Sequence, residues 1–180
     1  MQIYLIRHPP PSNDTGLCYG RMDVAVAPQA LNDAVESIKA RIPEYGVREA
    51  LVYSSPSTRC LELARQIAAP REPMVSEDLM EMDFGDWQGL AWDSLPRTEL
   101  DAWANALWDY RPGGGESAEM VNVRWQRWLS QVRPAHSKII IVITHAGLIR
   151  VAVARSGQLG REEALSAAVP FGSIHVLDVP

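Results

Sequence analysis

Two short apolar segments, one at the start of the chain and one near its end, each run into a histidine. Residues 3–6 are followed by Arg7 and His8, and residues 139–143 end two positions before His145. Residues 139–143 are all β-branched, which is typical of a central strand whose two faces are both buried. Because ligands bind at the carboxyl ends of the strands in an open α/β sheet, we expect the two histidines to line one pocket.

The rest of the chain alternates between strand-like and helix-like segments. Apolar residues at helical spacing predict helices at about 30–42, 55–68 and 117–132, and a further helix after Gly147. The predicted strands lie at 2–6, 50–54, 73–76, 138–143 and 173–179. This alternation favours βαβ units, and hence an α/β fold with a mostly parallel sheet. Since there is no repeat or linker, we expect one domain over residues 1–180.

Two further signals concern the connections. Ser55 is placed to cap the helix that follows the second strand, with Pro56 at its first position. Segment 79–112 is less regular and carries four of the six tryptophans, and three glycines at 113–115 end it. These glycines are not a P-loop, because no Gly-Lys-Ser/Thr sequence follows them.

Charge and composition argue against several classes of protein. The net charge of −5 disfavours nonspecific binding to nucleic acid, which needs a basic excess. No apolar run is long enough to span a membrane, and the N-terminus leads directly into a strand rather than a signal region. Cys18 and Cys60 make no disulfide framework. We therefore expect a cytoplasmic protein with reduced thiols.

Arg7 and His8 have the elements of a phosphoryl-transfer site. A histidine that attacks phosphorus must be neutral and held in one tautomer, with cations nearby to stabilise the phosphoryl charge. Arg7 supplies one cation, and Arg59 supplies another from the first turn of a helix, where free N–H groups also favour anions. Taken singly, each is also compatible with an ordinary exposed side chain, and the dipeptide alone favours that simpler interpretation.

Glu81 and His145 are the other candidates for chemistry. Glu81 is flanked by Met80, Met82 and Phe84, and partial desolvation there would raise the pKa of its carboxyl group toward general-acid use. The alternative for Glu81 is a surface acid in an irregular loop. His145 follows the clearest strand of the chain.

Five short motifs, in this order, resemble those of the histidine phosphatase (phosphoglycerate mutase-like) superfamily. They are RH at 7–8, SSPSTR at 54–59, EMDFGDW at 81–87, GGGES at 113–117 and THAG at 144–147. Each is weak alone, but together they span nearly the whole chain. EMDFGDW, with LCYGR at 17–21, is most similar to the α-ribazole phosphatases of cobalamin nucleotide-loop assembly. The resemblance implies a three-layer α/β/α sandwich around a mostly parallel central sheet.

The resemblance also implies roles for individual residues. His8 would be the nucleophile that forms a phosphohistidine, and Arg7, Arg59 and His145 would bind the phosphoryl oxygens. Glu81 would protonate the leaving alkoxide and then deprotonate the water that attacks the phosphoenzyme.

Tyr19, Arg21 and Trp87 are candidates for contact with the rest of the substrate, although each can instead shape its own loop. The resemblance implies neither a metal ion nor another cofactor. The expected partner is a small-molecule phosphate ester, with no nucleic acid and no membrane, and the expected state is a monomer or a homodimer.

The chain departs from the family pattern directly after the nucleophile. The family usually has glycine there, whereas this chain has Pro9, Pro10 and Pro11. Proline fixes φ and lacks the backbone N–H that could otherwise meet a phosphate. Pro9 therefore either stiffens the loop harmlessly or weakens phosphate binding.

The predicted function is a metal-independent phosphomonoesterase that acts through a phosphohistidine. The first predicted substrate is α-ribazole 5′-phosphate or its adenosylcobalamin-linked form. Hydrolysis is favoured over transfer, because the loops leave little room for segments that shield a phosphoenzyme from water. The alternatives are another small phosphate ester, a phosphoglycerate mutase-type phosphotransferase, a protein phosphohistidine phosphatase and a non-catalytic phospholigand-binding module.

Overall fold

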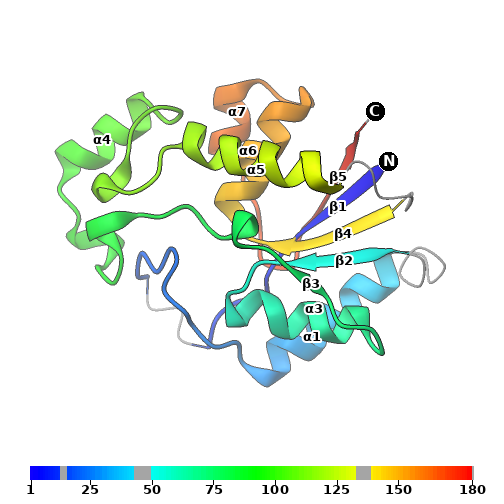
Figure 1. The fold of residues 1–180 in the computed structure, drawn as a ribbon. Coiled ribbons are helices and arrows are strands. Elements are labelled where there is room, and N and C mark those ends of the chain that lie inside the picture. The colour runs from blue at the N-terminus through cyan, green and yellow to red at the C-terminus, as the bar shows by residue number, and fades with distance from the viewer. Residues whose placement is uncertain (13–15, 43–49, 133–138, 180) are drawn as a thin grey trace.

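The computed structural model describes residues 1–12, 16–42, 50–132 and 139–179, which are built around a single five-stranded sheet (Figure 1). The strands are β1 (Gln2–Arg7), β2 (Leu51–Ser54), β3 (Met74–Val75), β4 (Ile139–Thr144) and β5 (Ile174–Asp178), in the order β3-β2-β4-β1-β5. Neighbouring strands are parallel except β5, which runs antiparallel to β1 at one edge. The predicted, mostly parallel sheet is confirmed.

Helices cover both faces of the sheet. On one face lie α1 (Pro28–Arg41) and α3 (Thr58–Ala68), and on the other lie α5 (Ala118–Val132) and α6 (Ala146–Ser156) (Figure 1). Along β4, Ile141 and Ile143 join the apolar core beneath α1 and α3, whereas Ile140 and Val142 join the core beneath α5 and α6. Alternate side chains of one strand thus fill both cores, which confirms the three-layer α/β/α sandwich.

The strand register brings the two histidines to the same edge of the sheet. In the parallel pair of β1 and β4, Arg7 lies opposite Thr144. His8 and His145 follow these residues directly, and the backbone N–H of His8 donates to the Thr144 carbonyl at 3.0 Å. Both histidines therefore leave the sheet at the carboxyl ends of adjacent strands, as the sequence predicts.

α3 begins later than the sequence predicts. Its N-cap is Ser57, so Ser55 does not cap the helix and Pro56 lies before it. Ser55 is held at the sheet edge instead, because its N–H donates to the Ile143 carbonyl and its hydroxyl oxygen lies 2.8 Å from His145 Nε2. Because Ser55 makes these contacts at the sheet edge, α3 begins three residues further along the chain, at Thr58.

Segment 79–112 contains more helix than its sequence pattern indicates. Short 3₁₀ turns lead to α4 (Arg97–Asn105), which lies away from the sheet layers (Figure 1). No residue of α4 is fully buried, and its apolar side chains Leu100 and Trp103 pack only partly against the apolar cluster of this segment, so the pattern that they leave in the sequence is short. α7 (Arg161–Ser166) is likewise not predicted, and only one of its residues is buried. None of the helices in the described part of the chain has the length and apolarity needed to cross a membrane.

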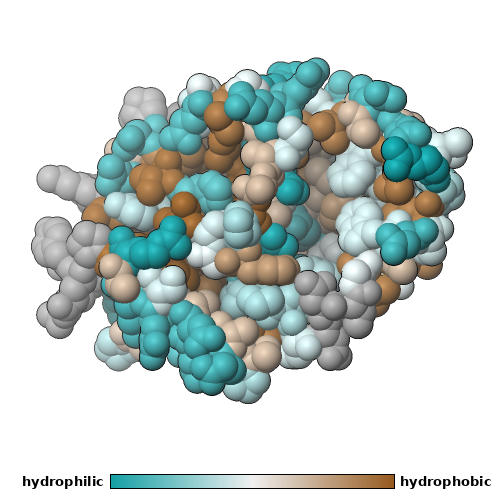
Figure 2. All heavy atoms as spheres, turned by 180° about the vertical axis from the view of Figure 1, so that it is seen from behind, coloured by the Kyte–Doolittle hydropathy of each residue, from teal (hydrophilic) through white to brown (hydrophobic). Residues whose placement is uncertain are grey.

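The tryptophan-rich segment has a small apolar cluster of its own. Cys18, Trp87 and Leu95 are buried at its centre, and Trp92 and Trp103 pack against them. Seen from behind, the surface of the molecule is hollowed between the part that carries α4 and the body that holds the sheet (Figure 2). Most of the tryptophans in this segment therefore stabilise a separate lobe beside the sheet edge.

Candidate active site

His8 is buried at the end of β1, with 1% of its surface exposed. Its Nδ1 lies 2.7 Å from the carbonyl oxygen of Pro9. Because a carbonyl only accepts hydrogen bonds, Nδ1 carries the proton and Nε2 keeps its lone pair. Burial, followed by the charge of Arg59, lowers the pKa of His8 to about 3. The imidazole is therefore neutral near pH 7, with Nε2 unprotonated.

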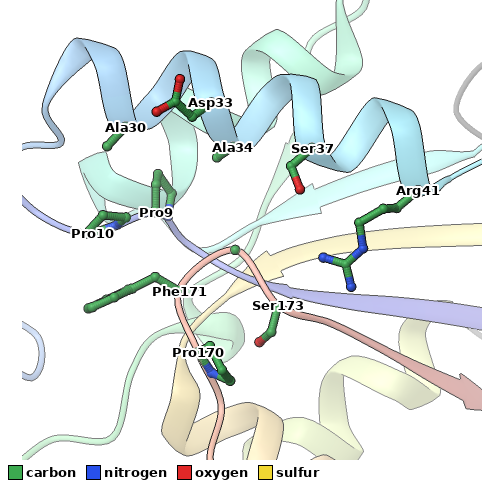
Figure 3. Close-up of a pocket in the computed structure, with 11 residues that line it drawn as sticks. Pro9, Pro10, Ala30, Asp33, Ala34, Ser37, Arg41, Pro170, Phe171 and Ser173 are labelled. Carbon is green, nitrogen blue, oxygen red and sulfur yellow. The ribbon is translucent and has the colours of Figure 1, made fainter.

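The same contact explains how the chain accommodates Pro9. His8 uses the carbonyl of residue 9, which proline retains, rather than the N–H that proline lacks. Pro9 also lines a cavity of about 510 Å³ between α1 and residues 170–173. In Figure 3, Pro9, Pro10 and Phe171 lie at one end of this cavity and Arg41 lies at the other. Proline at position 9 is thus compatible with a neutral and oriented His8.

Arg59 lies between the two histidines and is fully buried. Its Nε is 3.3 Å from His8 Nε2, and its Nη2 is 3.2 Å from His145 Nδ1. Further N–H groups donate to the carbonyls of Gly20 at 2.6 Å and Met22 at 2.8 Å. Among the described residues, no carboxylate forms an ion pair with Arg59. A buried cation without a counter-ion is a strong binding group for an anion.

Arg7 supplies a second cation, which is half-buried at the end of β1. Its Nη1 donates to the Val169 carbonyl at 2.5 Å, and its guanidinium carbon lies 3.7 Å from the centre of the Phe171 ring. Its Nε is buried and has no hydrogen-bond partner among the described residues. A buried donor without a partner costs about 1–3 kcal/mol, so an anion that accepts its hydrogen bond would remove that penalty.

His145 faces His8, with 5.2 Å between the centres of the two rings. An arginine N–H can only donate, so Nδ1 of His145 accepts from Arg59, and Nε2–H donates to the Ser55 hydroxyl at 2.8 Å. Burial, followed by the charges of Arg59 and His8, holds the pKa of His145 well below its ordinary value. The cluster therefore contains two neutral imidazoles and two guanidinium cations.

Glu81 is held at the N-terminus of α6, the helix that His145 precedes. Its Oε1 accepts the backbone N–H of Met82 at 2.9 Å and that of Gly147 at 3.0 Å. A Cβ atom at position 147 would lie 2.4 Å from this oxygen, so glycine is required for the contact. The structure thus brings the predicted general acid to the helix terminus beside His145.

The three predicted substrate-contact residues have different surroundings. Tyr19 borders the cluster, because its ring centre lies 5.1 Å from the Arg59 guanidinium carbon. Arg21 forms an ion pair with Glu116 at 3.0 Å. Trp87 is 3% exposed and donates its indole N–H to a glutamate of α4. Of the three, only Tyr19 borders the histidine–arginine cluster, whereas Arg21 pairs with Glu116 and Trp87 packs in the apolar cluster of the tryptophan-rich segment. Contact of these residues with the substrate stays a prediction.

Sequence reasoning missed several residues that orient this cluster. Ser55 holds His145 instead of capping a helix, and Gly147 admits the carboxylate of Glu81. Phe171 packs against an arginine of the site from a segment without a motif. The one available signal was Gly147, the third residue after β4, because a glycine can mark a close approach of another group.

The cations of the site are side chains of the protein. Within residues 1–12, 16–42, 50–132 and 139–179, no group of three or more His, Cys, Asp or Glu side chains is placed to hold a metal ion. Cys18 and Cys60 are both buried and free.

A sheet edge with two neutral imidazoles, two guanidinium groups and one oriented carboxyl group has the charges and the nucleophilic nitrogens that phosphoryl transfer requires. The chain belongs to the histidine phosphatase superfamily (branch 1), whose family model matches residues 3–180. It is a phosphatase of that superfamily.

Three curated relatives illustrate the range of the family. The chain is 32% identical to phosphoglycerate mutase-like protein 4 of Arabidopsis thaliana over 161 residues, which cover 83% of this chain and 68% of the relative. It is 27% identical to putative phosphoserine phosphatase 2 of Hydrogenobacter thermophilus, over 89% of this chain and 81% of that protein. It is 26% identical to the adenosylcobalamin/alpha-ribazole phosphatase of Escherichia coli, over 86% of this chain and 78% of that protein.

Solved structures confirm the fold. The mycobacterial glucosyl-3-phosphoglycerate phosphatase in complex with VO3 superimposes with a TM-score of 0.84 at 21% identity, covering 98% of this chain and 92% of that chain. The alpha-ribazole phosphatase of Shigella flexneri superimposes with a TM-score of 0.81 at 23% identity, covering 100% and 91%.

Proposed function

We propose that the protein is a metal-independent phosphomonoesterase that forms a phosphohistidine on His8 Nε2. The observation that carries this proposal is the state of His8, which is buried and neutral, with Nδ1–H fixed by the Pro9 carbonyl and Nε2 facing Arg59. A neutral imidazole with one nitrogen held as a donor presents the other as a nucleophile.

In the first step, Nε2 of His8 attacks the phosphorus of the ester as the bond from phosphorus to the ester oxygen breaks. Glu81 gives its proton to the leaving alkoxide, so an alcohol departs. In the second step, Glu81 takes a proton from water, the resulting hydroxide attacks phosphorus, and the P–N bond breaks. Inorganic phosphate leaves, and both residues return to their starting protonation states.

The two arginines stabilise the charge that develops on the phosphoryl oxygens during both steps. Arg7 offers its unpartnered Nε–H, and Arg59 offers N–H groups that also donate to the Gly20 and Met22 carbonyls. Removal of one preorganised donor of this kind typically lowers kcat by about 10²–10³-fold.

For the substrate, we propose α-ribazole 5′-phosphate or its adenosylcobalamin-linked form. The similarity to the Escherichia coli adenosylcobalamin/alpha-ribazole phosphatase over most of both chains supports this choice. Tyr19 and Phe171 place aromatic rings beside Arg59 and Arg7, which suits an ester that carries an aromatic base. Phosphoserine is the second candidate, because a similar relative is named as a putative phosphoserine phosphatase.

Phosphate release in the presence of EDTA tests the proposal. The wild-type protein would be assayed with α-ribazole 5′-phosphate, phosphoserine, 3-phosphoglycerate and a nucleoside monophosphate. We expect kcat/KM of at least about 10⁴ M⁻¹s⁻¹ for the ribazole ester and much lower values for the others. Equal, slow turnover of every ester would support the proposed phosphatase activity but contradict the proposed substrate. Transfer of phosphate between hydroxyl groups without its release would indicate a mutase. Release from phosphohistidine peptides alone would indicate a protein phosphatase. Tight vanadate binding without turnover of any ester would indicate a binding module.

A further inference from the structure

The backbone carbonyl of Glu81 accepts hydrogen bonds from two arginines that come from distant parts of the chain. Arg21, in the first loop, donates from Nε at 3.1 Å. Arg124, on α5, donates from Nη2 at 3.1 Å and also holds the Asp78 carbonyl with Nη1 at 2.7 Å. Both donors carry a charge, and hydrogen bonds from charged groups are stronger than those between neutral groups. The two arginines therefore hold the Glu81 carbonyl firmly.

Glu116 joins these two arginines. Its Oε1 lies 3.0 Å from Arg21 Nη2 and 3.1 Å from Arg124 Nε, and its Oε2 lies 3.2 Å from Arg124 Nη2. Its carboxylate also accepts the N–H of Asp83 at 3.1 Å, and its own N–H donates to the Asp83 carbonyl at 2.8 Å. The side chain of Arg124 is only 7% exposed, so this network lies largely out of solvent, where its charges act strongly.

The network reaches the carboxylate of Glu81 through a single peptide unit. The Glu81 carbonyl and the Met82 N–H belong to the same planar peptide, so fixing the oxygen fixes the direction of the N–H. That N–H donates to Glu81 Oε1 at 2.9 Å. The arginines that hold the oxygen therefore also determine where the carboxylate points.

The first loop connects this network to the phosphoryl-binding side of the site. Arg21 is flanked by Gly20 and Met22, whose carbonyls accept hydrogen bonds from Arg59. The N–H of Arg21 also donates to the side chain of Gln88 at 2.6 Å. One short segment thus contacts both the cation beside His8 and the peptide that orients Glu81.

We infer that Glu116, through Arg21 and Arg124, positions Glu81 for proton transfer to the leaving group. None of these three residues is assigned a reacting role, and each acts through the Glu81–Met82 peptide. This inference rests on the proposed function, because it takes Glu81 as the general acid.

Esters with different leaving groups distinguish a loss of Glu81 positioning from a general loss of activity. An alkyl phosphate needs a proton from Glu81 as its alkoxide departs, whereas p-nitrophenyl phosphate releases a stable phenolate without one. We expect Arg21→Gln and Glu116→Gln each to lower kcat/KM for the alkyl ester by about 10–100-fold, with kcat/KM for p-nitrophenyl phosphate within about threefold of wild type. The comparison uses kcat/KM because it covers the steps up to formation of the phosphohistidine, whereas kcat also includes phosphohistidine hydrolysis, in which Glu81 is the base for both esters. Arg21→Lys, which keeps the charge, should recover part of the alkyl activity.

Arg127→Gln is the matched control. Arg127 lies on the same helix as Arg124 and pairs with Asp78, and in the described part of the chain no hydrogen bond or ion pair joins it to Glu81 or Glu116. The ratio of alkyl to aryl activity should remain at the wild-type value in this variant. Because the side chain of Arg21 is about one-third exposed, Arg21→Gln should fold even if Glu116→Gln does not. Thermal unfolding shows whether each variant is folded.

A second measurement combines each variant with Glu81→Gln. If the network acts through Glu81, Arg21→Gln should cause no further loss of alkyl activity in the Glu81→Gln background. Equal losses on both esters, or losses that add to that of Glu81→Gln, would overturn the inference while the phosphatase stands. Failure of the wild-type protein to release phosphate from any ester would overturn the proposed function and this inference together.

Discussion

Gly147→Ala adds a single methyl group at the point where Glu81 approaches α6. The new Cβ would lie 2.4 Å from Glu81 Oε1, whereas ordinary contact begins near 3.4 Å. The carboxylate must therefore retreat by about 1 Å or rotate away from the helix terminus. Met82 Cβ lies at 3.4 Å, in ordinary contact, and can remain where it is.

The effects on stability and on activity should differ in size. Alanine favours a helix by up to about 1 kcal/mol over glycine, while the lost hydrogen bond to a charged group costs about 1.5–3 kcal/mol. The net loss of unfolding free energy should be about 0.5–2 kcal/mol from these terms. A catalytic group displaced by about 1 Å lowers turnover by about 10²-fold.

Urea unfolding and steady-state kinetics with an alkyl phosphate measure these two quantities. Gly160→Ala is the matched control, because a Cβ there meets no atom closer than 3.9 Å, and it should leave turnover unchanged. For p-nitrophenyl phosphate, kcat/KM of Gly147→Ala should stay close to that of wild type, because formation of the phosphohistidine from this ester needs no proton from Glu81. Full alkyl activity in Gly147→Ala would refute the placement of Glu81 as the general acid at this helix terminus.

Three other changes have expected outcomes. Burial lowers the pKa of His8 and His145 and keeps both neutral in the folded protein, so the unfolded state binds more protons below pH 6.5. The free energy of unfolding should therefore fall from pH 6.5 toward pH 3, by up to about 1.4 kcal/mol per pH unit for each histidine. In urea titrations, His8→Gln should reduce this slope. Pro9→Gly retains the carbonyl that holds His8, so kcat should stay within about threefold of wild type while stability falls by about 0.4–1 kcal/mol; a large loss of kcat would show that proline itself orients the nucleophile. Glu81→Gln should slow alkyl ester turnover by about 10²–10⁴-fold and preserve vanadate affinity, since Arg7, Arg59 and both histidines remain; loss of vanadate binding, measured by calorimetry, would place Glu81 in the anion site instead.

The sequence predicts the sheet edge well, because the signal there is local. Residues 139–143 are β-branched throughout, and such a run fits only a strand buried on both faces. Once β1 and β4 are recognised as parallel neighbours, the positions of His8 and His145 follow from chain direction alone. The position of Arg59 is predicted from its place in the first turn of the helix that follows β2.

The remainder of the site depends on tertiary contacts that no local pattern contains. Ser55 has the sequence context of a helix cap, yet its hydroxyl is used by His145. α4 has nine residues and none of them is fully buried, so the apolar pattern that it leaves in the sequence is short. Arg21 and Arg124 meet on the Glu81 carbonyl from positions far apart in the chain, a contact that only the folded structure can reveal.

Covalent labelling of His8 tests the central claim most directly. Wild-type protein would be mixed rapidly with a ³²P-labelled ester, quenched in denaturant at alkaline pH, and mapped by peptide mass spectrometry. We predict a phosphohistidine on His8 that forms and decays at rates compatible with turnover, and no label on His8→Ala, which should also be inactive. Steady turnover without labelled His8, or full activity of His8→Ala, would contradict the account.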